Sequence, residues 1–244
     1  MPLPIVTDPG TSHCGACQVR TVGMCRHLLD GASGAPPRLK PDHRVSGPQQ
    51  ILYRADQQLD HLHIIREGWA LRYVSLSAGR RMVMAILLPG DMISTLPLFS
   101  DRFGASVQMI TAGRYCLYSR EEVRQHLFGS DSGLSFWGRI NREELESCAR
   151  KMADIGRRPA AERIARLILD ITGRLHQRGL PAQHEIPFPL TQQHIADATG
   201  LTPIHVSRTL NVFRQKEIMR LSRGVLVIHD PAQLHHVADM EPAP

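Results

Sequence analysis

The spacing of apolar and polar residues divides the chain into a first half of short strands and a second half of helices. Between Ile51 and Ser119, short apolar runs alternate with turn residues such as Glu67-Gly68, Ala78-Gly79-Arg80 and Pro89-Gly90-Asp91. Runs of this length at this spacing are typical of strands in an antiparallel roll or barrel. The pattern therefore predicts a β roll whose strands include HLHIIR, WALRYVSL, RMVMAILL, ASVQMI and RYCLYS.

Helical periodicity follows after Glu121. From Leu134 to Ile155 a narrow seam repeats every three or four residues, through Trp137, Asn141, Leu145, Cys148, Met152 and Ile155. Such a seam along a long helix is typical of a helix that lies along a partner helix, so we predict a parallel homodimer. Packing of this helix against its own roll is the alternative.

A second helical region begins after Gly156 to Pro159, which break the long helix. The segment AAERIARLILDITGRLHQRG is amphipathic, and four of its residues suit burial beneath the elements that follow: Ala160, Ile164, Leu167 and Leu175. By contrast, residues 26–50 are rich in proline and glycine with little periodicity, which predicts a tether.

The segment TQQHIADATGLTPIHVSRTLNVF, residues 191–213, has the pattern of a helix-turn-helix. Gly200 can adopt the left-handed backbone that the turn requires. Thr202 is expected to cap the second helix, with Pro203 in its first turn. Apolar residues at helical spacing predict the buried faces of the two helices: Ile195 and Ala198 in the first, and Val206, Leu210 and Phe213 in the second.

The opposite face of the second helix carries His205, Ser207, Arg208 and Asn211. Because an arginine can donate to O6 and N7 of guanine together, this face suits the reading of bases in a major groove. An ordinary two-helix corner with a solvated face is the alternative. Residues 219–229 then predict a hairpin around Arg223-Gly224, the wing of a winged helix, and Asp230 is expected to cap a last short helix.

The charge distribution agrees with a nucleic-acid partner. The net charge of +6 and pI near 9.4 favour a polyanion, and residues 191–229 hold five basic side chains against two acidic ones. No apolar run is long enough to span a bilayer, and no signal sequence is recognisable at the amino terminus. We therefore expect a cytoplasmic protein without a membrane partner.

Five cysteines in a reducing compartment predict thiol or metal chemistry rather than disulfides. Cys14 and Cys17 bring two thiolates within reach of one metal centre, Cys25 adds a third, and Cys116 in the predicted strand RYCLYS qualifies as a fourth. Four thiolates suit iron-sulfur or zinc about equally by ligand type, and the histidines beside this segment, His13 and His27, keep a mixed zinc site open. Cys148 lies on the predicted dimer seam and is expected to act as a small buried hydrophobe.

The order of cysteine-rich head, β roll, long helix and winged helix resembles the CRP/FNR superfamily of bacterial transcription regulators. Its more specific marks are PGD at 89–91, GRRPAAERIA at 156–165 and SR at 207–208. The head CGACQVRTVGMC resembles the FNR branch, which holds an oxygen-labile 4Fe-4S cluster on three amino-terminal cysteines and a fourth in the roll. This resemblance implies Cys14, Cys17, Cys25 and Cys116 as ligands, although seven residues separate Cys17 from Cys25, more than in some members.

The resemblance implies an α+β fold with four parts. Residues 1–48 would form the cysteine-rich head and linker, 49–132 the antiparallel β roll, 133–156 the dimerisation helix and 157–244 the winged helix-turn-helix. The function implied is a homodimeric regulator, not an enzyme, that binds palindromic operators in double-stranded DNA while its cluster is intact, with RNA polymerase as a further partner. A regulator with a cysteine thiol switch or zinc site is the alternative, and an iron-sulfur electron carrier or enzyme lacks a substrate-pocket signature.

The resemblance also marks where this chain departs from the family. The expected DNA-contacting residues are Thr202, Ile204, His205, Ser207 and Arg208, and Ile204 stands where members typically carry a base-contacting glutamate. Cyclic-nucleotide-binding members carry a Gly-Glu pair and an arginine followed by serine or threonine, and neither is present in MISTLPLFSDRFGASVQ, so no cyclic nucleotide is expected. Histidines His43, His61 and His63 leave haem ligation open.

Overall fold

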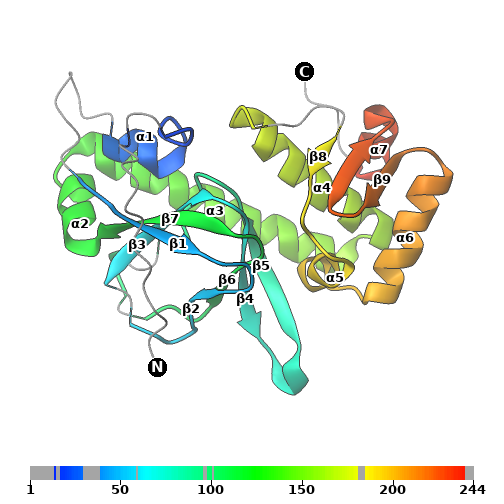
Figure 1. Cartoon of the computed structure of the whole chain (residues 1–244), viewed down its shortest axis with the longest axis horizontal. Coiled ribbons are helices and arrows are strands. Elements are labelled where there is room, and N and C mark those ends of the chain that lie inside the picture. Colours follow the sequence, from blue (N-terminus) through cyan, green and yellow to red (C-terminus); the bar gives the residue numbers. More distant parts are fainter. Residues whose placement is uncertain are drawn as a thin grey trace. The chain divides into compact units, whose positions relative to one another are not determined.

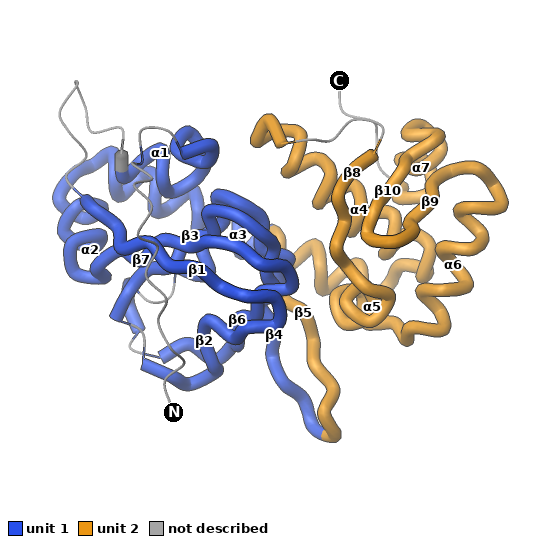
Figure 2. Tube along the Cα trace, in the orientation of Figure 1, with its two compact units in different colours: residues 1–77, 85–146 blue, residues 78–84, 147–244 orange. Residues whose placement is uncertain are grey.

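The computed structural model describes residues 14, 17–29, 39–58, 60–95, 98–100, 102–180 and 185–239. Figure 1 shows the elements in chain order, and Figure 2 shows the two compact units into which they divide. The first unit comprises residues 1–77 and 85–146, and the second comprises residues 78–84 and 147–244. Strands in the first half and helices in the second confirm the predicted α+β class.

Two antiparallel sheets form the roll, which belongs to the first unit except for residues 78–84. One has the order β1 (Asp42–Ser46), β7 (Gly113–Ser119), β3 (His61–Glu67). The other has the order β2 (Ile51–Tyr53), β6 (Ser106–Met109), β4 (Ala70–Ser75), β5 (Arg81–Leu87). A short 3-10 turn, η2 (Ser77–Gly79), joins β4 to β5. Each of the five predicted runs forms a strand, so the roll is confirmed.

Two elements overlap residues 26–50, which the composition predicted to be a tether. The helix α1 spans Gly23–Leu29, and β1 spans Asp42–Ser46. The prediction was wrong for β1 because its partner is distant in sequence: Asp42 pairs with Leu117 and Ser46 with Gly113. Five residues of mixed polarity carry no periodic signal, and the strand is held by the edge of β7.

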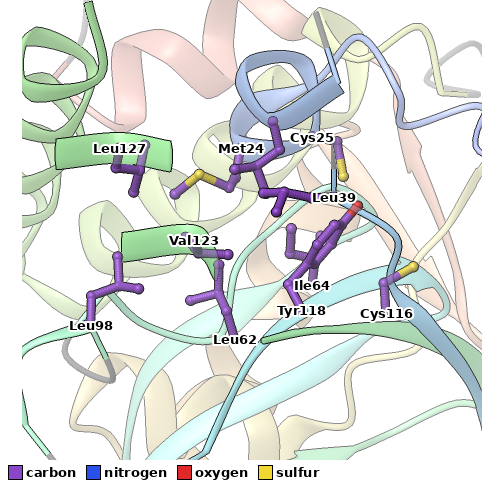
Figure 3. Close-up of a cluster of buried hydrophobic side chains, with 11 residues drawn as sticks. Met24, Cys25, Leu39, Leu62, Ile64, Leu98, Cys116, Tyr118, Val123 and Leu127 are labelled. Carbon is purple, nitrogen blue, oxygen red and sulfur yellow. The ribbon is translucent and has the colours of Figure 1, made fainter. Parts of the chain in front are cut away.

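The core of the first unit contains two of the cysteines. Buried side chains from α1, β3, β7 and α2 (Arg120–Phe128) meet there, as Figure 3 shows, and they include Met24, Cys25, Leu28, Leu39, Leu62, Ile64, Leu98, Cys116, Tyr118, Val123 and Leu127. Phe136, Trp137 and Ile140 of the long helix pack against this cluster. The helix and the cysteines therefore share one core.

The long helix α3 spans Asp131–Arg157 and includes the whole predicted seam. Trp137 packs against the core of its own roll, as the alternative interpretation expected for this part of the helix. Farther along, Leu145 is 71% exposed and Met152 is 75% exposed. Within the described residues, the predicted seam therefore divides into a packed amino-terminal part and a later part on which Leu145 and Met152 are exposed.

The second unit is built on α4 (Ala160–Gln177), against which α5 (Gln192–Thr199), α6 (Pro203–Gln215) and α7 (Pro231–Val237) pack. Its sheet has the order β8 (Ile186–Pro187), β10 (Val225–Ile228), β9 (Met219–Ser222). The predicted hairpin is confirmed, with Arg223 and Gly224 both at positive φ. On α4 the buried face is Ile164, Ala165, Ile168, Ile171 and Leu175, whereas Ala160 and Leu167 are only partly buried. No helix within the described ranges is long and apolar enough to cross a membrane.

Candidate functional site

The cysteine region is built from the head segment and one strand of the roll. Cys14 and Cys17 are partly buried and lie in successive turns, in which the Cys17 amide donates to the Cys14 carbonyl (3.2 Å). Cys25, on α1, is 4% exposed, and Cys116, on β7, is 5% exposed. Strand pairing fixes Cys116 between His43 of β1 and Ile64 of β3.

The PGD turn holds the head segment in place. Gly90 has a φ of +94°, and a Cβ built there would lie 2.7 Å from Cγ1 of Val22. The Asp91 carboxylate accepts from the Leu88 amide (2.8 Å), and the Gly90 amide donates to the Ile65 carbonyl (2.7 Å). The turn thus presents bare backbone on which Val22 rests, three residues before Cys25.

The buried core brings cysteines from both parts of the chain together, because Cys25 and Cys116 belong to one cluster and Cys14 packs against it. Burial, and then the neighbouring Cys17, raises the pKa of Cys25 to about 12. Burial raises the pKa of Cys116 to about 12 as well, and the other three predicted ligands all add to this rise. The Arg66 guanidinium opposes the rise in pKa at Cys14 and Cys116. Crowded, buried thiols resist ionisation without a cation, and a metal centre supplies the positive charge that stabilises them as thiolates.

Two polar side chains contact these cysteines. The Nδ1 atom of His43 lies 3.5 Å from the Sγ atom of Cys116, and the Tyr118 hydroxyl hydrogen-bonds to Cys25. In the part of the chain that the structure describes, no three cysteine, histidine or acidic side chains are already arranged to hold a single metal ion. The four sulfurs fit the donor set of an iron-sulfur cluster, which is larger than one ion.

The other predicted ligands lie elsewhere. His27 stacks on Phe136 with ring centroids 4.1 Å apart, and His13 lies outside the described residues. His63 is engaged with the carbonyl of His61 through Nδ1 (3.1 Å) and stacks on Tyr115. Cys148 is partly buried on α3 and belongs to the second unit, whereas the four clustered cysteines belong to the first.

The helix-turn-helix has the predicted local geometry. Gly200 ends α5 with φ +67°, and the Thr202 hydroxyl caps α6 by accepting from the His205 amide (3.3 Å). Sequence reasoning missed a capping box at the start of α5. There the Thr191 hydroxyl accepts from the His194 amide (3.1 Å), and His194 Nδ1 accepts from the Thr191 amide (3.2 Å). The expected partner in this motif is Glu or Gln, so a histidine gave no signal.

The outer face of α6 carries the predicted base-contacting residues. Ile204 is 64% exposed, His205 and Arg208 are exposed, and Ser207 is partly buried. The inner face is fixed by Val206 and Phe213, which are fully buried. Ile204 is therefore not part of the core, and an apolar side chain stands where an interface can use it.

A β roll and a helix-turn-helix unit in one chain define a DNA-binding transcription regulator. Residues 44–129 match the cyclic nucleotide-binding domain family, and residues 162–237 match the Crp-like helix-turn-helix domain family. The chain belongs to the CRP/FNR family. The match of the roll shows its fold, and the expectation that no cyclic nucleotide binds stays a prediction.

Several proteins with similar sequences are named as regulators. The chain is 29% identical over 223 residues to the transcriptional activatory protein AadR of Rhodopseudomonas palustris, covering 91% of each chain. It is 23% identical to the anaerobic regulatory protein of Aggregatibacter actinomycetemcomitans, covering 91% of this chain and 86% of the relative. The solved structure of FixK2 from Bradyrhizobium japonicum has a TM-score of 0.74 at 22% identity, covering 84% of this chain and 100% of that one. The two relatives from R. palustris and A. actinomycetemcomitans are named as regulators and not as enzymes, as the sequence analysis expects of this chain.

Proposed function

We propose that this regulator responds to oxygen or redox state through a 4Fe-4S cluster held by Cys14, Cys17, Cys25 and Cys116. It would bind palindromic operators as a homodimer while the cluster is intact. The observation that carries the proposal is that Cys25 of α1 and Cys116 of β7 lie in one core cluster with Cys14 packed against it, although they come from two distant parts of the chain. The name of the anaerobic regulatory protein among the relatives supports an oxygen-linked role.

The residues around the thiols would couple ligation to the rest of the fold. A bound 4Fe-4S cluster supplies sensitivity to oxygen, because oxygen degrades it. Three of its ligands lie on the head segment and the fourth on the paired strand β7, so ligation would fasten α1 to the roll. Phe136, Trp137 and Ile140 of α3 pack on the same core. Their packing would therefore change when ligation of the cluster fixes α1 against the roll. The coupling free energy between cluster ligation and the packing of α3 then sets the change in DNA affinity.

The exposed stripe on α3 supports the homodimer. Leu145 and Met152 are seven residues apart, so they lie on one face of the helix, and both are more than two-thirds exposed. Large apolar side chains repeated on one exposed face mark an interaction surface. Two reading helices in fixed relation are what a palindromic operator with half-sites one helical turn apart requires.

A thiol switch or a zinc site is the second candidate. The contact between His43 Nδ1 and Cys116 Sγ at 3.5 Å favours it, because imidazole beside thiolate is a common zinc ligand pair. Both candidates use the same cysteines and the same DNA-binding surface.

Anaerobic purification followed by admission of air separates the two candidates. We expect visible absorption that bleaches in air, with iron and sulfide in the proportion of a 4Fe-4S cluster. Alanine at any of the four ligands should abolish the absorption, while the control Cys148→Ala should retain it. Full iron content in Cys116→Ala would overturn the ligand assignment, and zinc without sulfide would establish the second candidate.

The homodimer is tested by placing a charge on the exposed stripe. Met152→Glu should yield monomers with weakened operator binding, because a buried unpaired charge opposes association. The matched control is Ala153→Glu, which places the same charge on an exposed neighbour outside the predicted seam. Sedimentation velocity and operator titration under anaerobic conditions measure both. If Met152→Glu sediments as the wild type does and binds the operator equally well, α3 does not form the dimer.

A further inference from the structure

Tyr118 occupies a position that the ligand assignment does not use. It lies on β7 two residues after Cys116, so the two side chains point to the same face of the strand. Its side chain is 1% exposed within the core cluster. Figure 3 shows its hydroxyl end directed at Cys25 of α1, with Cys116 on the neighbouring part of the same sheet. One aromatic side chain thus reaches from the strand that carries one cysteine to the helix that carries another.

The Tyr118 hydroxyl is a hydrogen-bond donor in an apolar environment. A buried hydroxyl without a partner is costly, and here the partner is the sulfur of Cys25. A phenol O–H donates and a sulfur accepts, so Tyr118 is the donor in this contact.

We infer that Tyr118 is a positioning residue of the cluster site, whose hydroxyl donates a hydrogen bond to the ligand sulfur of Cys25. The inference rests on the proposed function and adds a determinant of how readily the site responds. Hydrogen bonds to ligand sulfurs are among the features that set the reduction potential of an iron-sulfur centre. A donor withdraws charge from the sulfur and so favours the more reduced state. Tyr118 would then delay the response to oxygen and fix the rotamer of Cys25.

Tyr118→Phe removes this hydroxyl and keeps the ring. The control is Tyr115→Phe, which removes a hydroxyl from the other face of the same strand, where Tyr115 is partly buried and stacks on His63. Both variants should retain wild-type iron and sulfide after anaerobic purification. In Tyr118→Phe the visible absorption should be lost in air about three to ten times faster, as expected from the loss of one ordinary hydrogen bond.

The midpoint potential provides a readout that a purely structural role would not move. We expect it to fall in Tyr118→Phe and to stay unchanged in Tyr115→Phe. Replacement of Tyr118 by 3-fluorotyrosine keeps the shape and strengthens the donor, so it should shift the potential in the opposite direction and slow the bleaching. This second variant decides the question if Tyr118→Phe fails to hold a cluster.

The outcomes separate this inference from the proposed function. A wild-type protein without iron and sulfide would overturn the proposed function and the inference together. A wild-type protein with a cluster, whose potential and bleaching rate change with neither substitution at Tyr118, would overturn the inference alone. Equal changes in Tyr118→Phe and Tyr115→Phe would also overturn it, because the effect would not depend on the contact with Cys25.

Discussion

The helix-turn-helix and the cysteine region differ in how far apart along the chain their parts lie. The helix-turn-helix is complete within residues 191–213, and its caps and its turn depend on neighbours a few residues away. The cysteine region joins a head segment to a strand that begins at Gly113, and the contacts that hold the head come from a turn at Gly90. The geometry of the DNA-reading surface is thus set by residues close in sequence. The proposed sensing site depends instead on the packing of the head segment against the roll.

This difference predicts that a single methyl group added at the supporting turn weakens the docking of the head. Gly90→Ala places a Cβ at positive φ and against Val22, so we expect the free energy of unfolding to fall by about 2 to 4 kcal/mol. Gly79→Ala is the matched control, because Gly79 also has positive φ (+70°) but has open space around it. Its cost should be only about 1 kcal/mol. Chemical denaturation measures both, and equal losses would show that Val22 moves aside freely.

The local features of the helix-turn-helix explain why it could be read from the sequence. Gly200, Thr202 and Pro203 act through their own backbone and immediate neighbours, so their roles follow from residue type and spacing alone. The long helix was equally predictable from its periodicity. Its division into a packed part around Trp137 and an exposed stripe was not, because that depends on where the roll ends.

The structure around the cysteines could be predicted only in part. The spacing of Cys14, Cys17 and Cys25 identifies a candidate metal site, but nothing local indicates that Tyr118 reaches Cys25. The role of the PGD turn as a support for Val22 is likewise invisible in the sequence, as are the strands β1 and β8, whose pairing partners are distant. Each of these features requires knowledge of a contact between residues far apart in the chain.

A smaller effect is expected on discrimination at one base pair of the operator, the pair that residue 204 of α6 is predicted to contact. Ile204 offers only apolar contact, for instance to a thymine methyl, whereas a carboxylate accepts a hydrogen bond from cytosine N4. Ile204→Glu should therefore change discrimination at that base pair by about 1 to 3 kcal/mol and leave the guanine selected by Arg208 unchanged. Selection of binding sites from random DNA measures this, with Ile204→Val as the apolar control. If wild type and Ile204→Glu enrich the same half-site with equal stringency, Ile204 does not face the groove.

The smallest effect concerns the capping box of α5, where a titrating side chain replaces the usual glutamate or glutamine. His194 is 7% exposed, and its neutral Nδ1 accepts a hydrogen bond from the Thr191 amide. Burial lowers the pKa of His194, the positive charge of Arg81 lowers it further, and the negative charge of Asp197 opposes this shift. In the unfolded chain a histidine titrates near the ordinary value of about 6.5, so below that pH the unfolded state binds a proton that the folded state does not. The contribution of His194 to stability is therefore complete above about pH 6.5 and is lost as the pH falls towards the lowered folded-state pKa, with a slope of at most about 1.4 kcal/mol per pH unit.

The variant His194→Gln can complete the same capping box without titrating. Between pH 8 and pH 5.5 the free energy of unfolding of this variant should therefore fall less than that of the wild type, as measured by urea denaturation. His176→Gln removes an exposed histidine as the control. If the free energy of unfolding depends on pH in the same way for the wild type and His194→Gln, the capping box tolerates a protonated ring.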